Sequence, residues 1–83
     1  MSRRQYSGED VRKVLVNHGS FYLDRIAGDH YISVEAPEHH DSESRTVPVP
    51  DHDELAPSML RETRDQAGMK DFQAFLEWLD RNV

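Results

Sequence analysis

The sequence predicts an α+β domain with the element order αβββα and one added helix. Two observations support this fold class. Apolar residues recur at helical spacing near both ends of the chain, and three short segments between them have the composition and alternation of strands. We therefore expect a three-stranded antiparallel sheet with helices on one face only, which leaves the other face open for binding.

The first helix is expected at Gly8–His18. Ser7 before it is a typical N-cap, and the acidic residue three positions later forms a variant of the capping box. Apolar side chains follow at helical spacing from Val11, and Gly19 is placed to stop the helix. We expect residues 1–6 to form a flexible arm.

Three strands are expected at residues 21–26, 31–35 and 45–50. In the second strand Ile32 and Val34 share one face, and His30 shares it too if the strand is regular from its first residue. The third strand contains Pro48, which cannot donate to a hydrogen-bond ladder. This strand should therefore lie at an edge of the sheet.

Two helices should complete the chain. Pro57 fits the first turn of a second helix, which Gly68 ends. A third helix is expected at about Lys70–Arg81, and its aromatic and leucine stripe is typical of a core face. We interpret residues 1–83 as a single domain in which residues 69–83 form an added C-terminal helix.

Composition narrows the function further. The chain has no cysteine, which excludes disulfides and thiolate metal sites, and it has no apolar run long enough for a membrane span or a signal peptide. A cytoplasmic protein is therefore expected. The stretch His39-His40-Asp41 lacks a further ligand at a defined spacing, so we interpret it as a solvated loop and expect no metal site and no cofactor.

The charge of the chain is strongly acidic. Sixteen aspartates and glutamates face ten lysines and arginines, only two of which, Lys13 and Lys70, are lysines. Such a composition suggests a halophilic source, because molar salt shortens the Debye length to about 3 Å and screens the repulsion. Acidity normally argues against nucleic-acid binding, but the same screening weakens that argument.

The ordered set of motifs resembles the HicA (YcfA-like) toxins, mRNA interferases of type II toxin–antitoxin systems. Gly28-Asp29-His30 is similar to the Gly-Ser-His signature of that family, with aspartate in place of serine. Thr46-Val47-Pro48 is similar to its third-strand Val-Pro motif, and Gln66-Ala67-Gly68 to the end of its last helix. The resemblance covers about residues 7–68 and implies a fold like the double-stranded-RNA-binding domain.

The resemblance implies a function and a site. His30 would be the catalytic residue for RNA cleavage without a metal, with mRNA as substrate and a HicB-like protein as antitoxin. A histidine suits this task because its ordinary pKa allows proton transfer near neutral pH. Gly28, Asp29, Arg25 and Arg45 are the expected supporting residues of the site. Arg3, Arg4, Arg12 and Lys13 are expected to contact the RNA backbone.

Two questions stay open on the sequence alone. One histidine performs one proton transfer at a time, and the candidates for a second acid or base are Tyr31, His52 and Arg45. The alternative function is a non-catalytic RNA- or protein-binding module on the same fold.

The acid excess leads to a prediction about salt. Because self-repulsion destabilises a compact acidic chain at low ionic strength, we expect the melting temperature to rise between dilute buffer and molar KCl. Thermal melts monitored by circular dichroism measure this directly. A melting temperature that does not rise would contradict the halophilic interpretation.

Overall fold

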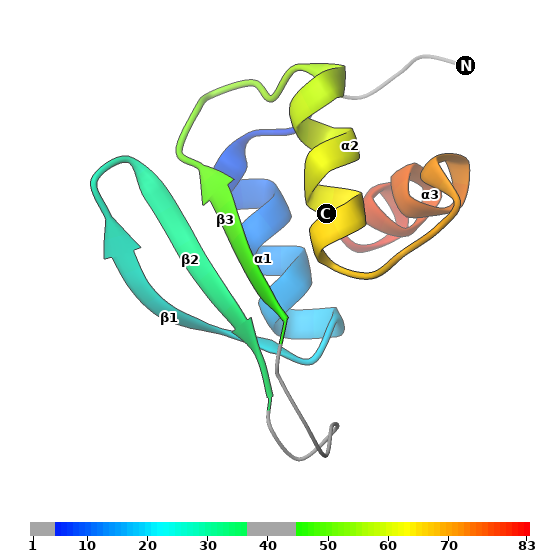
Figure 1. Cartoon of the computed structure of the whole chain (residues 1–83). Helices are drawn as coiled ribbons and strands as arrows, with labels where there is room; N and C mark the ends of the chain where they lie inside the picture. Colours follow the sequence, from blue (N-terminus) through cyan, green and yellow to red (C-terminus); the bar gives the residue numbers. More distant parts are fainter. Residues whose placement is uncertain (1–4, 37–44) are drawn as a thin grey trace.

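The computed structural model describes residues 5–36 and 45–83 of the chain. Its elements are α1 (Gly8–His18), β1 (Phe21–Ala27), β2 (His30–Glu35), β3 (Thr46–Pro50), α2 (Pro57–Gln66) and α3 (Phe72–Asn82) (Figure 1). The predicted α+β fold and element order are confirmed. Arg3, Arg4 and the stretch His39-His40-Asp41 lie outside the described residues.

The three strands form one antiparallel sheet in the order β1-β2-β3. The sheet is therefore a simple meander, and β3 lies at one edge, as Pro48 predicted. In the register of β2 and β3, Ile32 faces Pro48 and His30 faces Pro50. The strand β1 forms the other edge.

The helices cover one face of this sheet (Figure 1). The helix α1 contacts all three strands, α2 packs on β3, and α3 packs on α1 and α2. The core lies between these layers and contains fully buried side chains from α1, β3 and α3, namely Val11, Leu15, Val47, Val49, Phe75 and Leu79. No helix in the described ranges has the length and apolar character needed to cross a membrane.

The start of α1 forms as local chemistry predicts. The Ser7 hydroxyl accepts a hydrogen bond from the Asp10 amide at 3.0 Å, and the Asp10 carboxylate accepts one from the Ser7 amide at 3.2 Å. This reciprocal pair is the capping box. At the other end Gly19 caps the helix without a left-handed backbone, and Ser20 takes that conformation with a φ of 64°.

Tyr6 departs from the flexible arm expected at the N-terminus. Its side chain is only 3% exposed and belongs to the core cluster, and its hydroxyl donates a hydrogen bond to Asp80 of α3. The segment before α1 is thus fastened to the last helix. The bordering residue Trp78 also packs against the core, where its ring centroid lies 6.1 Å from that of Phe75.

The apolar alternation of β2 marks the open face of the sheet. Tyr31 and Ser33 face Val49 and Val47 of β3 and so point toward the helices, whereas Ile32 and Val34 point the other way. Ile32 is buried, with only 8% of its surface exposed, although it points away from the helices and lies outside the core cluster. The open face therefore carries apolar side chains of its own.

Gly8 allows α1 to approach the end of β3. Its amide donates a hydrogen bond to the His52 carbonyl at 2.8 Å, and a Cβ at this position would lie only 1.9 Å from the Pro50 carbonyl oxygen. No side chain fits here unless the helix moves away from the strand. Gly8 therefore sets the distance between α1 and the loop after β3.

We expect Gly8→Ala to lower the free energy of unfolding by about 1–3 kcal/mol, because the added methyl group overpacks a contact with backbone. Alanine otherwise favours a helix, so the clash has to outweigh a gain in propensity. Asn17→Ala, at an exposed site of the same helix, is the control and should change little. Urea denaturation measures both, and equal stability of the two variants would contradict this role.

Candidate functional site

The site forms around the tight turn that joins β1 to β2. Gly28 and Asp29 are its two central residues, because Ala27 and His30 form the last cross-strand pair. Gly28 has a φ of +62° and Asp29 a negative φ, which is the sign pattern of a type II′ hairpin turn. Glycine is needed here because it adopts a positive φ without strain, and not for lack of space, since a Cβ would meet nothing within 4 Å.

His30 begins β2 and points toward the open face. It shares this face with Ile32 because strand residues two apart point the same way. Its Nδ1 lies 2.9 Å from the Asp29 carboxylate, and the side chains of His30 and Asp29 are 42% and 73% exposed. An ionised carboxylate only accepts hydrogen bonds, so this contact places a proton on Nδ1 and leaves Nε2 as the acceptor of the neutral ring.

The turn is fixed from the side by the loop that follows β3. The Asp51 amide donates a hydrogen bond to the Asp29 carbonyl at 2.7 Å. The Tyr31 hydroxyl donates to the Asp51 carboxylate at 3.1 Å. Burial of the ring, followed by this hydrogen bond and the charge of Asp51, raises the pKa of Tyr31. Asp51 thus ties the backbone of the turn to the helix-facing side of β2, a role that the sequence analysis missed.

Arg25 is the predicted supporting cation that lies on the same face as His30. It pairs with Ile32 in the sheet register and is exposed, with its guanidinium in contact with the neighbouring Asp24 carboxylate. The structure therefore brings together Gly28, Asp29, His30 and Arg25 at one end of the open face.

Arg45 lies at the other end of the sheet. Its amide donates to the Glu35 carboxylate at 3.3 Å, its guanidinium lies 3.6 Å from the same group, and it packs over Gly68. Glu35 is five residues along β2 from His30, a distance of about 17 Å in an extended strand. The described structure does not bring Arg45 to His30.

Arg12 and Lys13 lie on α1, behind the sheet. Arg12 is half-buried, with its guanidinium 5.3 Å from the centre of the Tyr31 ring, and its Nε has no hydrogen-bond partner among the described residues. Lys13 is exposed, and its ammonium lies 3.4 Å from Glu9. The RNA contacts expected of both residues stay predictions.

The candidates for a second acid or base lie in different places. Tyr31 points to the helix side and binds Asp51, whereas His52 is exposed in the loop directly after Asp51. His52 therefore follows the residue that contacts the turn, whereas Arg45 lies at the other end of the sheet. Among the described residues, no three histidine or acidic side chains cluster as metal ligands would.

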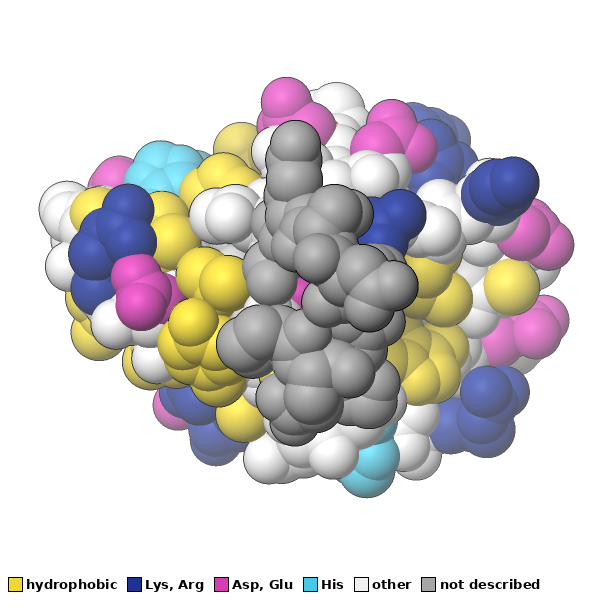
Figure 2. Space-filling model, turned by 60° about the horizontal axis from the view of Figure 1, so that its bottom comes forward, with side chains coloured by type: hydrophobic (Ala, Val, Ile, Leu, Met, Phe, Trp, Pro, Cys, Tyr) yellow, Lys and Arg dark blue, Asp and Glu magenta, His cyan; other side chains and the backbone are white. Residues whose placement is uncertain are grey.

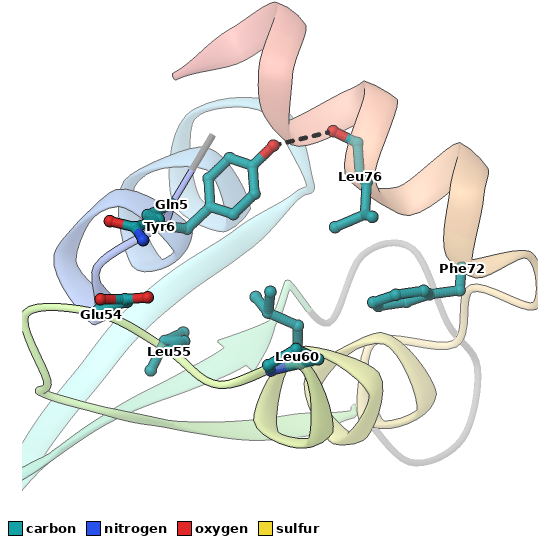
Figure 3. A pocket seen from close by; sticks show the side chains of 8 residues that line it. Gln5, Tyr6, Glu54, Leu55, Leu60, Phe72 and Leu76 are labelled. Carbon is teal, nitrogen blue, oxygen red and sulfur yellow. Dashed lines mark hydrogen bonds between the residues drawn. The ribbon is translucent and has the colours of Figure 1, made fainter. Parts of the chain in front are cut away.

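A separate pocket of about 410 Å³ lies on the helix side of the molecule. The first described residues, the loop before α2 and the two C-terminal helices form it, and Figure 3 shows the Tyr6 hydroxyl above Leu60, where it reaches the Leu76 carbonyl at 3.5 Å. Glu54 is its one acidic side chain, and no histidine lines it. It contains none of the predicted site residues.

A protein-family model of the HicA toxin of bacterial toxin–antitoxin systems matches residues 8–69. The chain belongs to the HicA toxin family. No curated protein and no solved structure matches the chain significantly. The matched region begins at the first residue of α1 and ends just after α2, so it contains the whole sheet and the turn but not α3.

Membership of the HicA toxin family confirms the resemblance seen in the sequence motifs. It places the chain in a toxin–antitoxin system and implies an antitoxin partner. Because α3 lies outside the match, its contacts with Tyr6 and α1 are features of this chain beyond the family core.

Proposed function

We propose that this HicA toxin is an endoribonuclease of the mRNA interferase class, with His30 as its proton-transfer residue. The observation that supports this most strongly is the position of His30 on the open face, partly exposed and oriented by Asp29. A proton-transfer group has to reach the substrate and stay in one orientation. His30 meets both conditions.

The chemistry is the cleavage of RNA by its own 2′-hydroxyl. In the neutral ring Nε2 takes the proton of the 2′-hydroxyl, whose oxygen attacks the adjacent phosphorus while the bond to the 5′-oxygen breaks. A cyclic phosphate forms, and the 5′-oxygen has to gain a proton from a second acid. His52 is the candidate that we favour, since it directly follows Asp51, whose amide donates a hydrogen bond to the Asp29 carbonyl of the turn.

Charge on the phosphate has to be offset locally, since the chain has a net charge of −6. Arg25 serves this purpose on the open face, because developing negative charge on phosphate is stabilised by nearby cations. Arg3, Arg4, Arg12, Lys13 and Arg45 are proposed as contacts to more distant phosphates. At high salt the general repulsion is screened, so local cations decide binding.

We expect His30→Ala to lower the rate of RNA cleavage about 10²- to 10⁴-fold while the fold stays intact, because a positioned acid–base group is lost and the side chain contributes no core packing. His18→Ala, which removes an exposed histidine at the end of α1, is the matched control and should cleave like wild type. The assay uses purified protein at a salt concentration where circular dichroism shows it folded. Equal cleavage by wild type and His30→Ala would rule out this role.

Asp29→Ser refines the same experiment. An exposed pair of this kind contributes about 0.2–1 kcal/mol, so the loss of ring orientation should lower the rate less than about fivefold. A faster variant would mean that Asp29 repels the phosphate instead of orienting His30. If no variant and no wild type cleaves RNA, the binding module becomes the better interpretation.

The antitoxin, proposed to be HicB-like, should cover the open face at the β1–β2 turn, since occlusion is the simplest way to neutralise an exposed site. In the complex we expect slower amide hydrogen exchange at residues 28–32. Tight binding with unchanged exchange in this segment would show that the antitoxin acts elsewhere.

A further inference from the structure

Exposed apolar side chains concentrate on β1. Among the described residues, four large hydrophobic side chains are exposed, and three of them, Tyr22, Leu23 and Ile26, belong to this strand. Ile26 is the most exposed at 61%. Figure 2 shows hydrophobic side chains beside charged ones on the side of the molecule where Figure 1 places the β1–β2 hairpin.

The outer edge of β1 is also unpaired in the described part of the chain, since β1 is the first strand in the sheet order. The two edges of the sheet differ in this respect. On β3, Pro48 and Pro50 have no amide N–H. In the register with β2, the amides of these two positions would point away from β2, so the free edge of β3 lacks two hydrogen-bond donors. The edge of β1 contains no proline, so its seven residues can pair with another strand.

The sequence of β1 is complementary to itself when it is read antiparallel. With a two-fold axis between Asp24 and Arg25, each of these residues faces its opposite charge in the second copy. Leu23 then faces Ile26, and Tyr22 faces Ala27. We propose that β1 is a dimerisation strand, which pairs in this register with β1 of a second copy of the chain.

The bulge in β1 supports this register. Between Leu23 and Arg25 the strand has one extra residue, Asp24, relative to β2. Leu23 and Ile26 therefore both point to the helix side, since they pair with Ser33 and Tyr31 of β2. In a bulge, two adjacent residues of one strand oppose a single residue of the partner strand. Both copies have this bulge, and the proposed two-fold axis brings the two bulges opposite each other. The two members of a facing pair then share a face of the joint sheet: Leu23 and Ile26 lie on the helix side, and Tyr22 and Ala27 lie on the open face.

The charges select the partner as well as the register. Charged residues and bulges on an edge usually prevent pairing with arbitrary strands. Within one chain the Arg25 guanidinium already contacts the Asp24 carboxylate. A second copy adds an opposite charge across the axis for each of the two residues, which a strand without this order does not. Cross-strand pairs of opposite charge and of large apolar side chains both stabilise antiparallel strands, so a two-fold interface gains each contact twice.

The dimer would form a continuous six-stranded sheet with both His30 side chains on one face. From strand spacing and rise, the two histidines would lie about 20 Å apart. Two open faces would thus join into one surface. The proposal concerns association alone and does not depend on RNA cleavage, because it is measured without RNA.

A seven-residue strand pair is a small interface beside the roughly 1,200–2,000 Å² of stable complexes, so we expect micromolar affinity. Sedimentation equilibrium over a series from micromolar to near-millimolar protein should therefore show a doubling of molar mass. The experiment uses the lowest salt concentration at which the wild-type chain is folded, so that screening does not weaken the attraction between the charge pairs. A wild type that stays monomeric throughout this range overturns the proposal.

Charge reversal tests the register. Asp24→Arg and Arg25→Asp each place like charges across the axis, and we expect each variant alone to dissociate at least tenfold more readily. Mixed together, the two variants restore opposite charges at both facing positions and should form a heterodimer. Both side chains are exposed, so neither change should disturb the fold, and circular dichroism of each variant is the check. Single variants that dimerise like wild type would overturn the register.

Ile26→Lys tests the strand itself, because lysine on an edge discourages pairing. The matched control is Val83→Lys, which alters an exposed apolar residue at the C-terminus, outside β1. Ile26→Lys should weaken the dimer at least tenfold and Val83→Lys should leave it unchanged. The opposite pattern would place the interface elsewhere and overturn the proposal. Hydrogen exchange gives a second check: β1 amides that are protected only when the antitoxin is added would assign the strand to that partner instead.

Discussion

Val47 and Val49 are both fully buried beneath the helices, and they alternate along β3 with Pro48 and Pro50 on the opposite face. The alternation of β3 fixes which face of the sheet is covered. Through the register, it also fixes the orientation of β2, so that Tyr31 and Ser33 point inward and His30, Ile32 and Val34 point outward. The exposure of the candidate catalytic histidine thus follows from the packing of two valines on a neighbouring strand.

Local chemistry in the sequence predicts most elements of the fold. The capping box at Ser7 places the start of α1 at the correct residue, and Pro48 correctly assigns β3 to an edge. The covered face of β2 was not predictable, because Ile32 and Val34 form an apolar pattern on the open side. The burial of Tyr6 was also missed, since it depends on α3, whose Asp80 lies 74 residues further along the chain.

The candidate site shows a similar division. The placement of His30 at the start of a strand follows from the glycine before it, and its contact with Asp29 is between neighbours in the chain. The distance between His30 and Arg45 depends instead on the register in which β2 pairs with β3. A long connection joins these strands, so the sequence alone does not predict that register. The contact of Asp51 with the turn depends on the same register.

The turn between β1 and β2 has two central residues, and its length has a consequence for homologous or engineered chains. Surface loops commonly tolerate insertions, but in a strand each shift by one residue reverses the side on which every side chain lies. One residue added after Gly28, if taken up by the strand instead of the turn, would send the histidine under the helices and bring a tyrosine onto the open face. The length of this hairpin is therefore constrained as tightly as the identity of the residues in it.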